Sequence, residues 1–345
     1  MVHSAVTQAQ VARHAGVSQS VVSAVLAENF AKIGVGEDVR QRVRASAQKL
    51  GYKVDSSARS LRSGRFGSIG YAVTVSHFVD FDFALSRTGV AEACAQAGVR
   101  VVQVRLPAAG EPDELDVPQV LSEQHLDGLI VHHSRPFSAR LNRAIKTWGG
   151  PTVHLNARLP RPCVWLDDVA GGAMMTQHLI DQGYRQIAFV RTWPDTSSHY
   201  SDADRPAGYE KAMTAAGLEA RRFTAASYDF DACREAFLAW LKRQPRIDAF
   251  FCYSDSDVGA LQQWLLDEPR RLFRDYAVAG YDDTPDWQRI YSNRLTTARV
   301  GRREMSVEAA RLLFQQITSG EPSRRCVRFK PELVVRESTK SLLEK

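Results

Sequence analysis

Short apolar segments alternate with amphipathic ones from Ser68 onwards, and this alternation restricts the possible folds more than any other feature of the chain. Segments that are apolar at successive positions are typical of strands covered on both faces. We interpret as strands the segments 68–75, 100–104, 127–133, 151–155, 186–190, 248–253, 276–283 and 328–336. Amphipathic helices are expected at 84–97, 138–148, 168–182, 207–217, 231–243, 255–267 and 302–318. The pattern predicts an α/β fold of two doubly wound subdomains, with a ligand cleft beyond the carboxyl ends of the strands.

The N-terminal segment follows a helical pattern instead. Residues 7–26 divide into two short helices at Gly16, which offers the left-handed backbone conformation that ends a helix. Ser18 is a good N-cap for the second helix, and Thr7 and Gln10 have the spacing of a capping box at the start of the first. The segment therefore predicts two short helices joined by a tight turn.

The second helix is expected to expose small side chains. Its apolar residues repeat at intervals of three and four, which indicates a single buried face. The residues expected on the other face are Gln19, Ser20, Ser23 and Ala24. Small polar side chains on the exposed N-terminal half of such a helix suit the DNA major groove and its base edges. The alternative is an ordinary helical hairpin in a bundle, because helix-turn-helix patterns are short and match by chance.

The distribution of charge favours the DNA interpretation. The chain has 45 Lys and Arg residues against 39 Asp and Glu residues, a net charge of +6. Residues 1–66 contain ten of the basic residues and only four of the acidic ones, so the remaining chain is neutral. A segment that meets phosphates is expected to carry such an excess. With a third helix expected at 37–50, we assign 1–54 to a helix-turn-helix headpiece, 55–67 to a linker and 68–345 to the core.

The linker contains one apolar residue that its composition does not explain. Residues 55–67 are rich in Ser, Arg and Gly, which is typical of a linker. One or two helical turns at 56–62 would leave Leu61 as the only large apolar side chain among arginines. Leu61 is therefore either an ordinary linker residue or a wedge that opens a minor-groove base step.

Several classes of protein are not indicated by the sequence. It has no signal pattern and no apolar run of the roughly 20 residues that a membrane span requires, so we expect a cytoplasmic protein without a membrane partner. Five widely spaced cysteines in apolar surroundings predict buried thiols, with neither disulfides nor a zinc site. The chain lacks the nucleotide-binding, metalloprotease and nucleophile-elbow motifs, so we expect no cofactor, no catalytic residues and no enzyme. His132 and His133 are adjacent on a strand and point in opposite directions, which predicts hydrogen-bonded histidines and no metal site.

Several motifs in one order give the chain a specific resemblance to a known family. The chain resembles the lactose-repressor/galactose-repressor family of bacterial transcription regulators along almost its entire length. The segments that carry the resemblance are QVARHAGVSQSVVSAVL (10–26), LGYKVDSSARSLRSGR (50–65), LDGLIV (126–131), HLIDQGYRQIAFV (178–190), RPAGYEKAM (205–213), FCYSDSDVGAL (251–261), AGYDDT (279–284), LTTARV (295–300) and PELVVRES (331–338).

The resemblance implies a homodimer that reads a near-palindromic operator through paired headpieces and a hinge helix. It also implies a core similar to periplasmic sugar-binding proteins, with one subdomain of 68–157 and 295–322 and another of 158–294 and 323–340. Since no heptad repeat follows Pro331, we expect a dimer and no tetramer. The residues that the resemblance places on DNA are Thr7, Ser18, Gln19, Ser20, Ser23, Asn29, Ala58 and Leu61. Arg205 matches the position that grips effector hydroxyls and Asp282 matches its acidic partner, although a purely structural ion pair is the alternative.

Some positions depart from the family pattern. Ala24 replaces a common arginine, so the half-site is expected to differ from the common one. The segment 30–38 is longer than usual, and Gly36 replaces the usual Ser cap, so reduced order or altered phosphate contacts are expected in the headpiece. In the effector cleft, Ser254 precedes Asp255 where Asn is expected, and Asn156 replaces a frequent Asp.

Arg191 and Trp193 occupy a strand-end loop that is typically rich in glycine. One hypothesis is an effector with negative charge, a sugar acid or sugar phosphate, stacked on Trp193 or Phe83. The alternative is that Arg191 points to solvent or pairs with Asp195. The sequence thus predicts a repressor whose operator binding is controlled by a sugar or sugar derivative. The functional alternative is a cytoplasmic sugar-binding module or degenerate enzyme with a non-regulatory headpiece.

Overall fold

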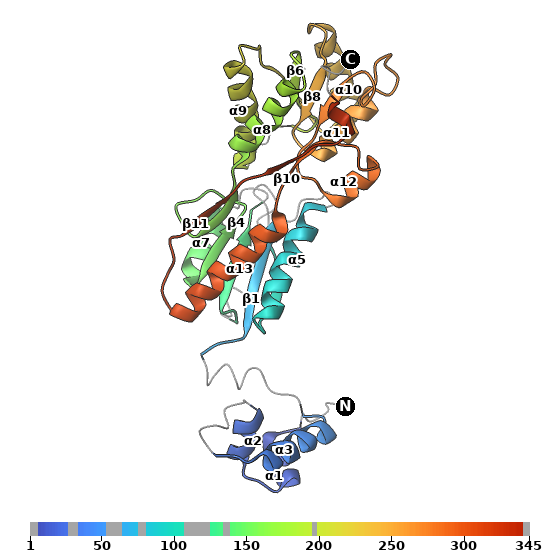
Figure 1. Cartoon of the computed structure of the whole chain (residues 1–345). Coiled ribbons are helices and arrows are strands. Elements are labelled where there is room, and N and C mark those ends of the chain that lie inside the picture. Colours follow the sequence, from blue (N-terminus) through green and yellow to red (C-terminus); the bar gives the residue numbers. More distant parts are fainter. Residues whose placement is uncertain are drawn as a thin grey trace. The chain divides into compact units, whose positions relative to one another are not determined.

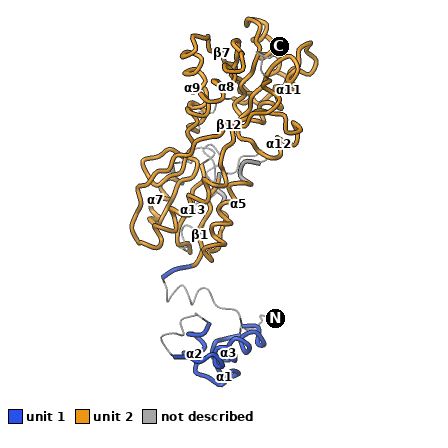
Figure 2. The backbone as a smooth tube through the Cα atoms, in the orientation of Figure 1, with its two compact units in different colours: residues 1–66 blue, residues 67–345 orange. Residues whose placement is uncertain are grey.

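The chain divides into two compact units, residues 1–66 and 67–345, which Figure 2 colours separately. The boundary falls at the end of the expected linker. The computed structural model describes residues 6–26, 34–52, 64–74, 81–106, 125–133, 139–194 and 199–340.

The first unit is a bundle of three helices, α1 (Gln8–Ala15), α2 (Gln19–Leu26) and α3 (Glu37–Leu50). The capping box is present at the start of α1: the Thr7 amide donates to Gln10 Oε1 at 2.7 Å, and the Gln10 amide donates to Thr7 Oγ1 at 3.3 Å. Gly16 ends α1 in the left-handed conformation, with φ 66°. The side chains that pack between the three helices are Val11, Ala12, Ala15, Val22, Val25, Val43 and Ala47.

One expectation about the outer face of α2 is wrong. Gln19 and Ser20 are exposed and Ser23 is half-buried, whereas Ala24 is buried at 7% exposure. Because α2 packs against both α1 and α3, its buried stripe is wider than the spacing of its large apolar residues indicates.

The first subdomain of the second unit is built on a parallel sheet in the order β11–β5–β4–β3–β1–β2. Its strands are β1 (Ser68–Thr74), β2 (Arg100–Leu106), β3 (Gly128–His132), β4 (Thr152–Leu155), β5 (Cys163–Leu166) and β11 (Cys326–Phe329). Helices α5 (Phe81–Gln96) and α13 (Arg302–Ser319) lie side by side on one face, and α7 (Ala139–Trp148) packs on the other (Figure 1). The strands alternate accordingly, since Tyr71 and Ile130 face α5 and α13 whereas Ala72 and Val131 face α7.

The second subdomain has a parallel sheet in the order β7–β6–β8–β9. Its strands are β6 (Ile187–Arg191), β7 (Arg221–Thr224), β8 (Ala249–Cys252) and β9 (Ala277–Ala279). Its helices are α8 (Asp168–Asp181), α9 (Tyr200–Ala215), α10 (Phe230–Lys242), α11 (Asp255–Trp264) and α12 (Pro285–Ile290). Along β6, Ile187 and Phe189 belong to one buried cluster and Ala188 and Val190 to another, so both faces of the sheet are covered. The predicted α/β fold with two doubly wound subdomains is confirmed.

The expected subdomain boundaries are wrong at two strands. The family resemblance places residues 158–166 and 323–329 in the second subdomain. In the structure, β5 pairs with β4 and β11 pairs with β5, so both strands belong to the first sheet. Both strands have only four residues, and 159 residues separate the end of one from the start of the other, so no local pattern identifies their pairing. The first subdomain therefore includes both strands.

The connections between the subdomains also differ from the expectation. The single final strand expected at 328–336 is divided at Pro331, which has no amide hydrogen for a ladder. After the break, β12 (Glu332–Val334) pairs antiparallel with β10 (Thr297–Arg299), and the two run between the subdomains (Figure 1). A short 3-10 helix, η2 (Glu337–Thr339), follows. Among the described residues, no helix is both long and apolar enough to span a membrane.

Candidate functional site

The N-terminal end of α2 presents a small polar surface. The side chains of Thr7, Ser18, Gln19 and Ser20 are exposed, and the Ser18 and Ser20 hydroxyls lie 2.8 Å apart. The Val21 amide donates to Ser18 Oγ at 3.4 Å, which is the N-cap contact expected there. Asn29, Ala58 and Leu61 lie outside the described residues. Four of the residues predicted to meet DNA are thus exposed on this unit, whereas Ser23 is half-buried.

The same unit carries several exposed cationic side chains. Arg13 lies near the end of α1, and Arg42, Arg44 and Lys49 lie on α3; all four are exposed. None of the four forms an ion pair with another described residue, whereas Arg40 is paired with Glu37. Within the described part of the headpiece, these four cations therefore have no carboxylate as an ion-pair partner.

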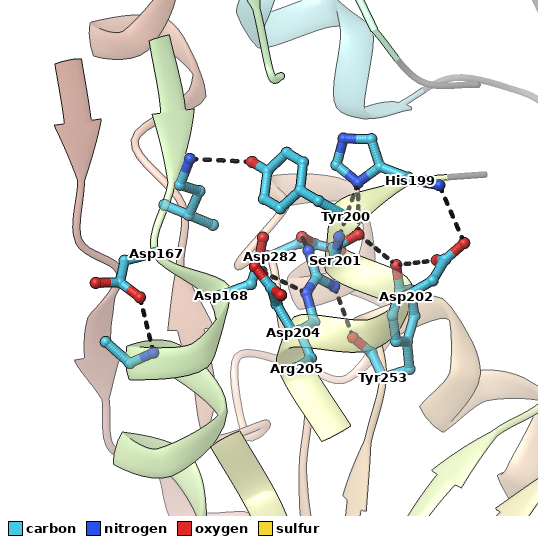
Figure 3. Close-up of polar contacts among 12 residues, drawn as sticks. Asp167, Asp168, His199, Tyr200, Ser201, Asp202, Asp204, Arg205, Tyr253 and Asp282 are labelled. Atoms are coloured by element: carbon cyan, nitrogen blue, oxygen red, sulfur yellow. Dashed lines mark hydrogen bonds and ion pairs between the residues drawn. The ribbon is translucent and has the colours of Figure 1, made fainter. Parts of the chain in front are cut away.

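A second polar cluster lies in the larger unit, around the Arg205 guanidinium (Figure 3). Arg205 Nε donates to Asp168 Oδ1 at 2.7 Å, and Nη1 donates to the Tyr253 carbonyl at 2.8 Å. The guanidinium carbon lies 3.9 Å from the centroid of the Tyr281 ring. Burial alone would lower the pKa of Arg205, but the carboxylates of Asp168 and Asp282 outweigh it and raise that pKa. Arg205 is therefore a charged group held on several sides in the interior.

Asp282 connects this cluster to the first subdomain. Its Oδ1 lies 3.5 Å from Arg205 Nη2 and 2.7 Å from Arg302 Nη2. Arg205 belongs to α9 of the second subdomain, whereas Arg302 begins α13, which packs on the first sheet. Asp282 also has a φ of 113°, a conformation that a residue with a side chain seldom adopts without cost. The Asp282 side chain, on a backbone of unusual conformation, is thus shared by guanidinium groups from two subdomains.

Arg191 lies at the end of β6 and its charge is compensated. Its Nη2 is 3.1 Å from Asp202 Oδ1, and its guanidinium carbon lies 4.5 Å from the centroid of the Tyr253 ring. The Tyr253 hydroxyl donates to the same carboxylate oxygen at 3.0 Å and lies 2.7 Å from Ser201 Oγ. Arg191 therefore does not point to solvent, and Asp195 lies outside the described residues.

Asn156 lies where the first subdomain meets the start of α9. It has a φ of 58°, and its amide Nδ2 donates to the His133 carbonyl at 2.9 Å. Its backbone carbonyl accepts from His199 Nε2 at 2.9 Å, and its Oδ1 accepts from the Tyr200 hydroxyl at 3.2 Å. Since a carbonyl only accepts, His199 carries its proton on Nε2. Burial is the main cause of the lowered pKa of His199, so this histidine is neutral.

Two of the expected effector residues have structural partners. Ser254 is the N-cap of α11, where its Oγ accepts from the Asp257 amide at 3.3 Å. Asp255 is 1% exposed and accepts from Thr297 Oγ1 at 2.7 Å and from Gln288 Nε2 at 3.3 Å. Burial, followed by the charge of Asp282, raises the pKa of Asp255 well above its usual range. Asp255 thus binds β10 through the Thr297 hydroxyl. An effector role for Ser254 or Asp255 stays a prediction.

Two aromatic residues, Trp193 and Phe83, were expected to stack on an effector. Trp193 is 36% exposed, and its ring centroid lies 6.3 Å from that of Tyr228, which is also exposed. Phe83 belongs to α5, and its side chain lies outside the described part of the structure. Stacking of a ligand on either ring stays a prediction.

His132 and His133 have different hydrogen-bond partners, as expected for adjacent residues on a strand. His132 Nδ1 lies 2.6 Å from the Tyr71 hydroxyl, whereas His133 Nε2 lies 2.8 Å from His154 Nδ1. Burial, with smaller contributions from neighbouring cationic groups, lowers the pKa of His133 to about 3 and that of His154 to about 4. Among the described residues, no group of three or more His, Cys, Asp or Glu side chains is placed to hold a metal ion.

Sequence reasoning missed several members of the cluster. These are Asp168, His199, Tyr200, Asp202, Tyr253 and Arg302. Most follow the carboxyl end of a strand, which is the edge where doubly wound sheets bind ligands. That rule was available from the sequence, but it does not say which polar residues after each strand turn toward one another.

Known proteins resemble this chain over nearly its whole length. A family described as a periplasmic binding protein-like domain matches residues 176–339. The HTH-type transcriptional repressor PurR of Photobacterium profundum is 30% identical over 338 residues, which cover 96% of this chain and 98% of the relative. The HTH-type transcriptional regulator CelR of Thermobifida fusca is also 30% identical, over 347 residues and the same shares of the two chains.

Solved structures agree with these relatives. A complex of the transcriptional regulator CelR with cellobiose superimposes with a TM-score of 0.67 at 26% identity, covering 96% of this chain and 99% of that one. The lac repressor dimer bound to operator and the anti-inducer ONPF gives a TM-score of 0.80 at 23% identity, covering 98% and 100%, which supports the fold. Because relatives 30% identical align across 96% of its length, the chain belongs to the lactose-repressor/galactose-repressor family of transcriptional regulators.

Proposed function

We propose that the protein is a dimeric repressor that binds a near-palindromic operator and is controlled by a small hydroxyl-rich effector in the core cleft. Its relatives support this proposal, since one is named as a repressor and another was solved with cellobiose. It acts in the cytoplasm as a DNA-binding regulator and catalyses no reaction. The residues proposed to meet DNA are Thr7, Ser18, Gln19, Ser20, Ser23, Asn29, Ala58 and Leu61.

The observation that carries the effector proposal is the Asp282 carboxylate shared by Arg205 and Arg302. An Arg fork and a carboxylate together satisfy vicinal hydroxyl groups, because one donates and the other accepts. A ligand that takes either partner from Asp282 changes the contact between the subdomains. Such a ligand shifts the equilibrium between two core states by its preference for one of them.

The charges favour an effector without net charge. Arg205 pairs with Asp168, Arg191 with Asp202, and Arg158 with Asp204 at 2.7 Å. The additional cation that suggested a sugar acid or sugar phosphate is thus compensated by a carboxylate from α9. We therefore propose a neutral sugar, with Arg205, Asp282, Asn156 and Arg191 near it.

The DNA half of the proposal is tested by selection from sheared genomic DNA of the source organism at near-physiological salt. We expect the wild-type protein to enrich a palindromic sequence. The double variant Gln19→Ala/Ser20→Ala is expected to bind that sequence at least 30-fold more weakly, because each lost base contact costs about 1–3 kcal/mol. Gln48→Ala, an exposed change on α3, is the matched control. Equal affinity of the double variant for the selected sequence would contradict the proposal.

The effector half is tested by calorimetry with neutral sugars and their acidic counterparts. We expect a neutral sugar to bind the wild-type protein and to bind the Asp282→Asn variant much more weakly. The affinity of the wild-type protein for the operator should change only when that sugar is added. Arg222→Ala, which removes an exposed ion pair on the same subdomain, should bind sugar normally. Binding of acids alone would overturn the neutral-effector proposal. Sugar binding without any DNA enrichment would instead favour the alternative, a sugar-binding module with a non-regulatory headpiece.

A further inference from the structure

Two of the five cysteines are neighbours in adjacent strands, contrary to the wide spacing seen in the sequence. Cys163 of β5 and Cys326 of β11 are directly paired in the parallel register. The Cys163 and Cys326 thiols each lie 3.4 Å from one acceptor, the Leu159 carbonyl oxygen. The Cys326 thiol also lies 2.9 Å from the Arg161 carbonyl oxygen. Both sulfur atoms therefore lie on the same side of the sheet and share the Leu159 carbonyl oxygen as a neighbour.

This placement suits a disulfide bond. Neighbouring strands lie about 4.8 Å apart, and this separation lies within the roughly 4.4–6.8 Å range of Cα separations found across disulfides. Directly paired residues also project from the same face of a sheet. Burial is the main cause of the raised pKa of Cys163, about 11, and the neighbouring Cys326 thiol adds to it, which agrees with close approach of the two sulfur atoms.

The two thiols differ in their access to solvent. Cys326 is exposed on the edge strand of the sheet, whereas Cys163 is 1% exposed. Cys94, Cys233 and Cys252 are buried as well. The expectation of five buried thiols is therefore wrong at Cys326. A residue on an edge strand has a neighbouring strand on one side only, so its other side is open to solvent. An oxidant in solution meets Cys326 first, and Cys163 is the nearest thiol behind it.

We propose that Cys326 and Cys163 form a reversible disulfide when the protein meets hydrogen peroxide. The Cys326 thiolate attacks one peroxide oxygen, the O–O bond breaks, and Cys326 becomes a sulfenic acid while water leaves after protonation. The Cys163 sulfur then attacks the Cys326 sulfur, the S–O bond breaks, and a second water leaves with the Cys163 proton. Two thiols are oxidised and one molecule of hydrogen peroxide is reduced. A dithiol reductant returns both thiols by exchange.

The bond would fasten two of the segments that enter and leave the second subdomain. β5 continues directly into α8, and β11 continues into β12, which runs back along β10. A disulfide between Cys163 and Cys326 closes a loop that contains α8 to β9 of the second subdomain and also β10 and α13. It also fixes edge strand β11 to the sheet, so oxidation is expected to make separation of β11 from β5 slower.

The experiment is oxidation of the full-length protein with hydrogen peroxide, followed by thiol counting and peptide mapping. We expect two of the five thiols to disappear, the linked Cys163 and Cys326 peptides to be recovered, and dithiothreitol to restore both. Hydrogen exchange in β11 should be slower in the oxidised protein. Cys326→Ser and Cys163→Ala should each abolish the linked peptide, whereas Cys94→Ala should leave it unchanged.

Three results would overturn the proposal. One is a sulfinic or sulfonic acid at Cys326 without any linked peptide. Another is a disulfide that joins Cys326 of two chains, visible as a cross-linked dimer on a non-reducing gel. The third is the loss of no thiol at peroxide concentrations that oxidise free cysteine. Since the wild-type peptide map alone distinguishes these results, a folding defect in Cys163→Ala does not affect the conclusion.

Discussion

The small polar surface at the start of α2 and the Arg205 cluster of the core differ in how their polar side chains are placed. Gln19 and Ser20 are exposed to solvent, on a helix whose other face is buried. Arg205 is 6% exposed and contacts two carboxylates, a carbonyl and an aromatic ring. The donors and acceptors of Gln19 and Ser20 are accessible to an external partner. The donors of Arg205 already bind other groups of the protein.

This difference predicts that substitutions on the exposed surface affect binding to a partner, whereas substitutions in the buried cluster affect folding. Removal of an exposed polar side chain costs contacts with a partner and changes folding little. Removal of one member of a buried ion pair leaves a charge without compensation in the interior. If the proposed effector binds at the core cluster, it must exchange partners with these side chains, and the energetic cost of breaking their contacts limits which ligands can bind.

The largest expected effect is that of Arg205→Met. The change leaves Asp168, at 1% exposure, without its cation, so we expect the free energy of unfolding to fall by about 3–5 kcal/mol. Urea unfolding measures this loss. The double variant Asp168→Asn/Arg205→Met should recover part of it, because the uncompensated carboxylate is then neutral.

Arg222→Ala is the matched control for that change. Arg222 also pairs with a carboxylate at 2.7 Å, but its side chain and that of Glu210 are 41% and 45% exposed. Exposed pairs contribute roughly 0–1 kcal/mol, so this variant should unfold almost as the wild type does. Losses of similar size in Arg205→Met and Arg222→Ala would contradict the distinction between a buried cluster and an exposed surface.

A pH dependence of stability is expected from the His133–His154 pair. Burial lowers the pKa of His133 to about 3 and of His154 to about 4, below the ordinary value of 6.5 that applies to the unfolded chain. Between these values the unfolded chain binds protons that the folded protein does not. Stability therefore falls as the pH decreases from about 6.5 toward 4, by up to about 1.4 kcal/mol per pH unit for each histidine.

Urea unfolding between pH 7.5 and 5 tests this expectation with the variant His154→Asn. At pH 7.5 the imidazoles are neutral, so the difference between variant and wild type reports the lost packing and the lost hydrogen bond to His133, without a contribution from protonation. At lower pH the variant should lose stability less steeply. A slope as steep as that of the wild type would show that His154 is not one of the groups that take up protons on unfolding.

The contrast between the two regions also explains what could be predicted from sequence. The bounds of α3 agree with the predicted 37–50, because Gly36 and Gly51 mark its ends through local backbone preferences. The capping box at Thr7 and the turn at Gly16 are local in the same sense. Features decided within a few residues of the chain are thus accessible to sequence reasoning.

The core cluster and the disulfide candidate were less accessible because their contacts are distant in sequence. Arg205 was identified through a family motif, but Asp168 lies 37 residues before it and Tyr253 lies 48 residues after it. The pairing of Cys163 with Cys326 depends on two four-residue strands at the edge of a sheet. Ala24 shows the same limit on a smaller scale, because its burial depends on two neighbouring helices.

A smaller effect is expected from Thr7→Ala in the headpiece. The change removes the hydroxyl that accepts from the Gln10 amide and opens the capping box, which costs about 1 kcal/mol. Hydrogen exchange of α1 in the full-length protein should become roughly fivefold faster. Thr88→Ala is the control, since the Thr88 hydroxyl donates to the Ala84 carbonyl within a helix and caps nothing. Equal exchange in wild type and Thr7→Ala would mean that the cap contributes no stability.

The smallest effect is expected from Gly36→Ser, at the start of α3. Gly36 has the extended conformation of an N-cap, with φ −65° and ψ 160°, but offers no side chain to accept from the first amides of the helix. Nothing lies within 4 Å of a Cβ at this position. A serine there should therefore stabilise α3 by a few tenths of a kcal/mol, measured as slower hydrogen exchange. Gly51→Ser is the opposite control, because its φ of 67° disfavours a side chain and should make exchange faster. If both serines had the same effect, the ends of α3 would be fixed by packing against α1 and α2, and not by the local preferences from which the sequence predicted them.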